Sequence, residues 1–182
     1  KAGARTIRRA DEASDRNSLW KGRKAAFAAV GQISPGYYVQ DGVVPRSTLP
    51  KVLSSIGKLS SIFELPVANV FHAGDGNLHP LILYDPRLPN IEKKVTELGA
   101  EILRECLFVG GSITGEHGIG SDKRCYLDWM FSNEDLETML LVRNAFDPDG
   151  LANPGKIFPT PRSCGESSRR NMTLKVTKNI DS

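Results

Sequence analysis

Two apolar runs, residues 67–73 and 78–84, are joined by a short polar turn that contains an Asp-Gly pair. Asp-Gly between two such runs is a preferred two-residue hairpin loop, because glycine accepts the positive φ that this turn needs. The sequence therefore predicts an antiparallel hairpin with residues 75–76 as its loop. In that register His72 pairs with His79, and the two imidazoles lie on one face of the sheet.

Helical and strand patterns lie on either side of this hairpin. Apolar residues at helical spacing predict four helices, and an apolar run ended by proline predicts another strand. The order lacks the repeated βαβ units of a doubly wound sheet, and no GxGxxG follows a strand, so a Rossmann dinucleotide site is not supported. The sequence therefore predicts an α+β fold with a mainly antiparallel sheet. The expected helices are residues 19–30, 47–63, 90–107 and 133–146, and the additional strand is residues 37–44.

The composition is that of an ordinary globular chain, with 182 residues of which 40% are apolar and 25% are charged. No apolar stretch approaches the roughly 20 residues that a membrane span needs. The net charge is +3, and residues 161–182 hold a surplus of three basic residues, so the remainder is neutral and does not resemble a nucleic-acid-binding surface. We expect residues 1–160 to form the folded region and residues 161–182 to be a disordered basic tail.

Two further features concern the context of the chain. Its three cysteines are widely spaced and form no CxxC motif, so we expect unpaired thiols in a reducing, cytoplasmic compartment. The sequence starts with Lys1, and no apolar signal-peptide region follows. We therefore expect a piece of a longer protein.

The chain has only three histidines, and all of them lie in glycine-rich turns. If His72 and His79 share a face of the hairpin, their imidazoles can converge on one divalent ion. A catalytic site of this kind needs an anionic ligand and an open position. In the glycine-rich segment at residues 110–120, Glu116 and His117 are adjacent, and adjacent side chains of an extended segment point in opposite directions. The simplest assignment of roles makes Glu116 the third metal ligand and leaves His117 free to act as a base.

A structural interpretation of the same residues stays open. A histidine beside a turn is commonly a hydrogen-bonded structural residue, and Asp75 and Asn77 are ordinary turn formers. Arg23, at helical spacing from Trp20 and Phe27, is either a surface arginine or a clamp for a carboxylate. The concentration of every histidine in two glycine loops favours a metal or catalytic site.

Longer stretches of the sequence carry a family resemblance. In chain order they are LWKGRKAAFAAVGQISPGYYVQDGVVPRSTLP, FHAGDGNLHPLILYDP, GGSITGEHGIGSDKR and FDPDGLANPGKIFPTPRSCGE. Over about residues 5–166 the chain resembles the C-terminal region of FAD-linked oxidases. Within that family it resembles the glycolate oxidase D subunits, which are related to D-lactate and D-2-hydroxyglutarate dehydrogenases.

The resemblance implies a ferredoxin-like α+β cap followed by a helical closing segment. In this family an N-terminal domain binds most of the FAD, and that domain is absent from the sequence. The implied cofactor is FAD, and the implied partners are the FAD-binding domain of a parent chain and other glycolate oxidase subunits. We expect the isolated fragment to be inactive, with neither a nucleic-acid partner nor a membrane span.

Carried over residue by residue, the resemblance assigns His72, His79 and Glu116 to a divalent metal, which is zinc, manganese or iron. It makes His117 the catalytic histidine. It also makes Arg23 the residue that binds the substrate carboxylate.

The resemblance assigns two further groups of residues. Asn153 and Lys156 match a segment that lies near the flavin. Where hydroxyglutarate-specific relatives carry polar residues for a second carboxylate, this sequence has Phe27, Val39 and Leu81. An apolar lining of this kind suits a small monocarboxylate such as glycolate or lactate.

The implied function is oxidation of a small 2-hydroxy acid to a 2-oxo acid, with hydride transfer to flavin. One alternative is a metal-dependent hydrolase without flavin, in which His72, His79 and Glu116 activate water. A second alternative is a non-catalytic fragment or assembly module, in which histidine substitutions leave function intact. The ordered motifs favour the flavoenzyme over the hydrolase.

Overall fold

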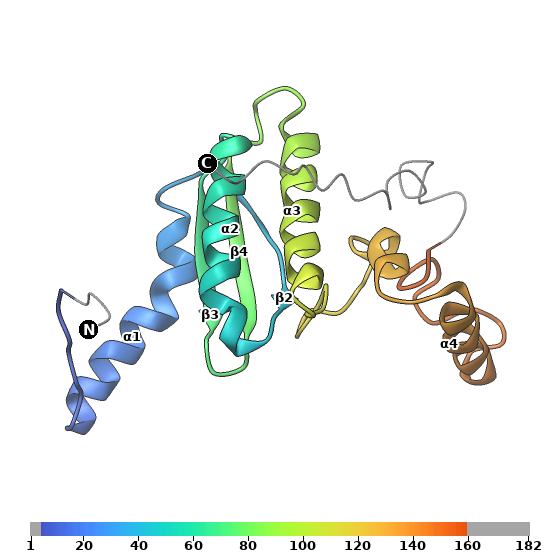
Figure 1. Cartoon of the computed structure of the whole chain (residues 1–182), viewed down its shortest axis with the longest axis horizontal. Helices are drawn as coiled ribbons and strands as arrows, with labels where there is room; N and C mark the ends of the chain where they lie inside the picture. The colour runs from blue at the N-terminus through green and yellow to red at the C-terminus, as the bar shows by residue number, and fades with distance from the viewer. Residues whose placement is uncertain (1–4, 160–182) are drawn as a thin grey trace, which may run out of the picture.

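The computed structural model of the protein describes residues 5–159 and has an α+β fold with an antiparallel sheet, as predicted (Figure 1). Short 3₁₀ helices at Arg46–Thr48 and Arg124–Trp129 complete the regular structure of this part of the chain. The tail predicted at residues 161–182 lies outside the described residues. The helices are α1 (Ala13–Val30), α2 (Leu49–Ile62), α3 (Ile91–Phe108) and α4 (Asn133–Phe146), and the strands are β1 (Gly36–Val39), β2 (Gly42–Val43), β3 (Val67–His72) and β4 (Asn77–Tyr84).

The long strand β4 lies at the centre of the sheet, with β3 on one side and β1 and β2 end to end on the other. β1 and β2 share one register against β4, and the ladder is interrupted opposite Pro80, which has no N–H to donate. The Pro80 carbonyl still accepts from Gln40 N at 3.0 Å. The run of strand, α2, β3, β4 and α3 is the split β-α-β arrangement of ferredoxin-like folds.

The β3–β4 hairpin differs from its predicted register. Its loop has four residues, 73–76, because His72 pairs with Asn77 instead of His79. The His72 carbonyl accepts from the amides at positions 75 and 76, both at 3.0 Å. Gly76 is held against the neighbouring strand, where its carbonyl accepts from Val44 N at 2.9 Å and an added Cβ would lie 2.0 Å from the Val44 oxygen. The shift is by an even number of residues, so His72 and His79 still share a face of the sheet.

Helices α2 and α3 cover the opposite face of the sheet and form the main core. α2 begins with Pro50 in its first turn, where a missing N–H costs nothing. Both helices bury one apolar stripe at helical spacing, as the sequence predicted. Every second residue of β4 faces these helices and packs against them. Residues at 1% exposure or less in this core include Val52, Ile56, Leu78, Ile82, Leu98 and Ile102.

The face that carries the histidines is covered far less. A small cluster of Val30, Leu81 and Leu83 joins the end of α1 to the sheet. The rest of α1 projects away from the sheet, and Trp20 is 53% exposed (Figure 1). α1 begins at Ala13, six residues before the predicted start, because the apolar stripe used for the prediction begins only at Leu19.

The C-terminal part of the described chain forms a third apolar cluster around Leu103, Ile113 and Leu127. α4 follows with a capping box between Ser132 and Asp135 and buries none of its residues. Figure 1 shows α4 on the far side of α3 from the sheet's histidine-bearing hairpin. None of the helices in the described chain combines the length and apolar character of a membrane span.

The cysteines agree only in part with the prediction of unpaired thiols. Cys106 is a free thiol that is fully buried in the main core. Cys125 is disulfide-bonded, so the prediction is wrong for this residue.

Candidate metal and active site

The three histidines of the sequence lie together in space. The His72 and His79 rings meet edge to face with centroids 5.4 Å apart. The His79 and His117 rings are stacked with centroids 5.0 Å apart. Since His117 comes from the glycine-rich loop at residues 110–120, this loop and the hairpin form one site.

His79 is the most buried of these groups, with 3% of its surface exposed. Within the described part of the chain, neither of its ring nitrogens has a hydrogen-bond partner. Burial lowers the pKa of His79 below its ordinary value, although the negative charges of Asp41 and Glu116 oppose this shift. A buried neutral imidazole with unpaired nitrogens is costly unless something binds it. This chemistry fits a metal ligand, which must present a free lone pair.

Glu116 faces the hairpin. Its Oε1 atom accepts a hydrogen bond from Asn77 Nδ2 at 2.6 Å and lies 3.4 Å from His72 Nε2. Asn77 is 4% exposed and pairs with His72 in the sheet. Asn77, which the sequence suggested only as a turn former, therefore orients Glu116.

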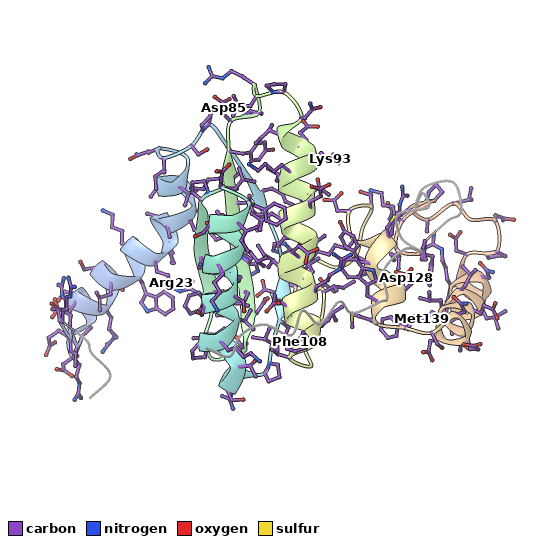
Figure 2. All side chains as sticks on the ribbon, turned by 45° about the horizontal axis from the view of Figure 1, so that its top comes forward. Arg23, Asp85, Lys93, Phe108, Asp128 and Met139 are labelled. Carbon is purple, nitrogen blue, oxygen red and sulfur yellow. The ribbon has the colours of Figure 1, made fainter. Side chains whose placement is uncertain are left out.

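Arg23 reaches the site from α1, and Figure 2 labels it on that helix. Its Nη2 atom lies 2.9 Å from His72 Nδ1. Because arginine only donates, Nδ1 accepts, and the ring proton of His72 is on Nε2, facing Glu116. Of the two interpretations left open by the sequence, this contact favours a guanidinium directed at the site.

Asp41 was not singled out by the sequence analysis, yet it lies at the centre of the site. It is fully buried and sits opposite His79 in the shared register of β1 and β2, with Oδ1 3.5 Å from His79 Nε2. Burial opposes ionisation, but backbone hydrogen bonds from His117 and Gly115 and one from the Thr114 hydroxyl outweigh it, so the pKa of Asp41 falls to about 2. The sequence feature that could have identified Asp41 is the pair of polar residues Gln40 and Asp41 within an otherwise apolar predicted strand.

Lys123 is a second residue that the sequence analysis missed. It is 6% exposed, and its Nζ donates to the Asp41 carbonyl at 2.8 Å and lies 3.7 Å from Asp41 Oδ2. Burial lowers the pKa of Lys123, while the Asp41 charge opposes that change. A lysine that follows a glycine loop carries no sequence signal of this role.

One group of side chains in the described chain brings its ligand atoms close enough together to hold a cation. The ligand atoms of Asp41, His79 and His117 all lie within 4.8 Å of one another. His72 and Glu116 are not part of that group: the set expected from the resemblance is connected in pairs, through the His72–Glu116 contact and the His72–His79 ring contact. His79 belongs to that group and to the expected set, so both describe one polar centre on the open face of the sheet.

The remaining expected residues lie at the margins of this centre. Asn153 and Lys156 are exposed, and their segment touches the glycine loop where Ile157 N donates to Gly120 O at 2.8 Å. Val39 pairs with Leu81, two residues along each strand from Asp41 and His79. Leu81 lies on the same face of β4 as His79 and has no exposed surface, because it packs in the small cluster with Val30. Phe27, on α1, is 38% exposed.

Known proteins that resemble this chain share one family. Residues 1–157 match the family described as FAD linked oxidases, C-terminal domain. The chain belongs to this family. The glycolate oxidase subunit GlcD of Escherichia coli strain K12 is 52% identical over 166 residues, which cover 91% of this chain and 33% of that protein.

More distant FAD-linked oxidases match over nearly the same range. GlcD of Bacillus subtilis is 33% identical over 87% of this chain and 34% of its own length. The mitochondrial D-lactate dehydrogenase [cytochrome] of Arabidopsis thaliana is 34% identical over 85% of this chain and 28% of its own length. The chain thus spans about a third of the length of these relatives.

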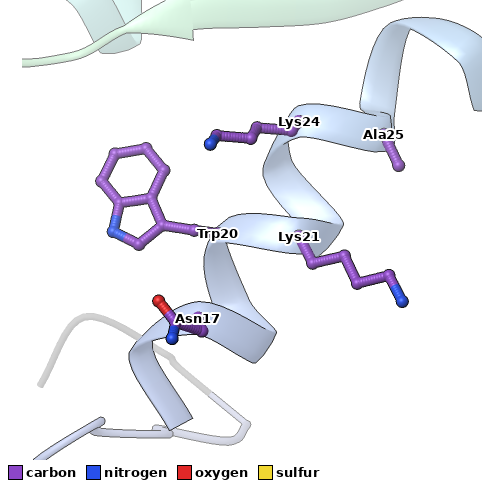
Figure 3. Close-up of a pocket in the computed structure, with 5 residues that line it drawn as sticks. All are labelled: Asn17, Trp20, Lys21, Lys24 and Ala25. Carbon is purple, nitrogen blue, oxygen red and sulfur yellow. The ribbon is translucent and has the colours of Figure 1, made fainter. Parts of the chain in front are cut away.

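The described part of this FAD-linked oxidase domain leaves its site open. A hollow of about 480 Å³ is lined entirely by residues of α1. Figure 3 shows these residues, including Trp20, Lys21 and Lys24. A second hollow of about 270 Å³ on the same helix includes Trp20 and Arg23. Neither hollow contains a candidate metal ligand. Both hollows lie on α1, the helix from which Arg23 contacts His72.

Proposed function

We propose that this domain is the substrate- and metal-binding part of an FAD-dependent 2-hydroxy acid dehydrogenase. The proposed reaction converts a small 2-hydroxy acid, such as glycolate or D-lactate, into the corresponding 2-oxo acid. The observation that carries this proposal is the convergence of His72, His79 and His117 around a buried imidazole without hydrogen-bond partners. The names of the relatives, glycolate oxidase subunit and D-lactate dehydrogenase, support the substrate class.

The proposed metal ligands are His72, His79 and Glu116. A bound divalent ion would supply Lewis-acid polarisation of the substrate hydroxyl and carboxylate oxygens. Imidazole and carboxylate ligands suit zinc, manganese or iron. Asn77 supports this set because it holds one oxygen of Glu116 on the hairpin side of the loop.

His72 couples the metal site to the substrate. For Nε2 to offer a lone pair, Nδ1 must carry the ring proton, and then Nδ1 can no longer accept from Arg23. Arg23 would therefore leave His72 when the site is loaded. A substrate carboxylate is the acceptor to which its guanidinium would turn, with paired charge-assisted hydrogen bonds.

His117 is the proposed general base. Its ring is stacked on His79, while its side of the loop is exposed. It would take the proton of the substrate hydroxyl as the hydride leaves the adjacent carbon, acting as a general base. FAD would supply the two-electron acceptor chemistry.

The apolar neighbours set the substrate size in this proposal. In this proposal the apolar side chains of Val39 and Phe27 lie where a second substrate carboxylate would need a charged partner. A buried carboxylate without such a partner is strongly disfavoured. A monocarboxylate is therefore the better fit. Asn153 and Lys156 would face the flavin, held by an FAD-binding domain of the complete protein, and other glycolate oxidase subunits are candidate partners.

The test uses the complete protein that contains this chain. Purified, FAD-loaded protein is mixed without oxygen with glycolate, D-lactate or D-2-hydroxyglutarate, and flavin absorbance near 450 nm is followed. We expect rapid bleaching with a small monocarboxylate, much slower bleaching with D-2-hydroxyglutarate, and loss of bleaching after chelator treatment that added metal restores. Bleaching that survives full metal removal would contradict the metal assignment, and metal-dependent ester cleavage without any bleaching would support a hydrolase instead.

A further inference from the structure

The carboxylate of Asp41 collects the donors of the glycine loop. Its Oδ2 atom accepts from Thr114 Oγ1 at 2.7 Å. It also accepts from the backbone amides of Gly115 at 2.8 Å, Glu116 at 3.1 Å and His117 at 2.9 Å. Three successive amides aimed at one carboxylate oxygen form an anion-binding nest, here filled by a side chain of the protein itself.

The surroundings of Asp41 hold it charged and in place. The buried Lys123 supplies the opposite charge, with Nζ 3.7 Å from Oδ2 and a hydrogen bond to the Asp41 carbonyl. A buried charge persists only when it is paired and hydrogen-bonded, and both conditions hold here. On its other side Oδ1 faces His79 Nε2 at 3.5 Å.

The loop needs this anchor because its functional side chains are exposed. Glu116 and His117 extend to the open side, while their amides point inward to Asp41. Gly115 approaches the sheet so closely that an added Cβ would lie 2.6 Å from Val43 Cγ2 and 2.8 Å from Asn77 Oδ1. The direction of both functional side chains is thus fixed through the backbone that Asp41 holds.

We propose that Asp41 is the positioning residue of this site, fixing the backbone of residues 115–117 so that Glu116 faces His72 and His117 stacks on His79. The reaction affected rests on the proposed function, whereas the positioning itself does not. The rival role is direct coordination, because Asp41, His79 and His117 bring ligand atoms within 4.8 Å of one another. The four hydrogen bonds already accepted by Oδ2 favour positioning.

The informative substitution is Asp41→Asn in the complete protein. Asparagine keeps the shape but removes the charge and adds N–H donors where the loop and Lys123 already supply donors. The matched control is Asp122→Asn, the same change at an exposed carboxylate next to Lys123. Thr114→Val is a milder variant that removes one donor from Oδ2 and keeps the carboxylate, in case Asp41→Asn does not fold.

Three readouts separate positioning from a merely structural role. Hydrogen exchange by mass spectrometry should show amides 115–117 exchanging about tenfold faster or more, while peptides from α2 and α3 keep their protection. Zinc affinity of the metal-free protein, titrated against a chromophoric chelator, should weaken roughly 10- to 100-fold. With the 2-hydroxy acid that bleaches the flavin, kcat should fall while KM stays within about threefold, because Arg23 is untouched. Thr114→Val should show the same pattern, weaker, and Asp122→Asn none of it.

Several results would overturn the proposal. One is unchanged exchange at residues 115–117 in a folded Asp41→Asn protein, or, if that variant does not fold, in Thr114→Val. Another is a loss of zinc affinity beyond about 1,000-fold with exchange unchanged, which would make Asp41 a ligand. A uniform loss of protection throughout the domain would make it only structural. If the wild-type protein oxidises no 2-hydroxy acid, the proposed function fails, but exchange and zinc affinity still decide the role of Asp41.

Discussion

The two faces of the sheet differ in what they bury and in the role this gives them. On one face, α2 and α3 bury a continuous set of aliphatic side chains, and β4 contributes residues such as Leu78 and Ile82 that have 1% exposure or less. On the other face, buried polar groups such as Asp41 and His79 lie beside a projecting helix whose Trp20 is half exposed. The first face provides most of the stability of the domain. The second holds costly polar groups in a fixed geometry, as a site of chemistry requires.

The largest effect is expected on the open face, from His117→Ala in the complete protein. Removing the proposed base should lower kcat by about 10²- to 10⁴-fold, the usual contribution of a general base. Metal content should stay near that of the wild type, because His117 is not among the proposed ligands. Steady-state kinetics and elemental analysis of the same sample check both parts. Metal loss in this variant would move His117 to the ligand set.

On the helix-covered face, Leu98→Ala in α3 should act on stability instead. Leu98 is fully buried in the main core, so its truncation should cost about 2–5 kcal/mol in the free energy of unfolding. Leu141→Ala in α4, where the side chain is 70% exposed, should stay within about 0.5 kcal/mol. Urea unfolding measures both. Similar losses from the two variants would mean that the described core is not the stabilising one.

Arg23→Met should separate substrate binding from the chemistry. Loss of a charge-assisted contact to the substrate carboxylate should raise KM about 10- to 100-fold, with a smaller change in kcat. The matched control is Lys24→Met, its neighbour on α1, which should leave KM unchanged. Steady-state kinetics against the preferred 2-hydroxy acid provide the measurement. Equal KM values in the two variants would return Arg23 to the role of an ordinary surface residue.

The last prediction concerns the helix-covered face at alkaline pH. Burial raises the pKa of Cys106 from 9.0 to about 12, and burial with the nearby Asp122 charge raises that of Tyr38 from 10.0 to about 12. The unfolded chain releases these protons first, so the stabilisation is complete below pH 9 and is lost between pH 9 and 12. Urea unfolding across this range should show the decline. The double variant Tyr38→Phe, Cys106→Ala should flatten it, and an unchanged slope would contradict the assignment to these groups.

Local patterns in the sequence predicted most of the fold. The apolar stripes of α2 and α3 and the two runs of the hairpin were sufficient, because periodicity reports directly which face of an element is buried. The loop length was wrong, since the backbone of the neighbouring strand at Val44 holds Gly76 and the sequence contains no trace of that contact. His72 and His79 still lie on one face of the sheet, because the predicted and observed registers differ by an even number of residues.

The site was predictable only where a residue type is rare. The three histidines and Glu116 could be selected because histidine is rare in this chain and these residues lie near glycines. Asp41, Asn77 and Lys123 are common residue types that act through tertiary contacts. Asp41 and Thr114 lie 73 positions apart, and no local pattern pairs them. Residues that bind can thus be proposed from the chain alone, but the groups that hold them in position require the fold.

Elemental analysis of the complete protein is the most direct test of the central claim, that His72 and His79 together with Glu116 hold one metal ion. The account predicts about one equivalent of zinc, manganese or iron in the wild type and its loss in His79→Ala. Asn69→Ala, an exposed position on the same hairpin but on the opposite face, should keep the metal. Full metal content in a folded His79→Ala protein would contradict the account.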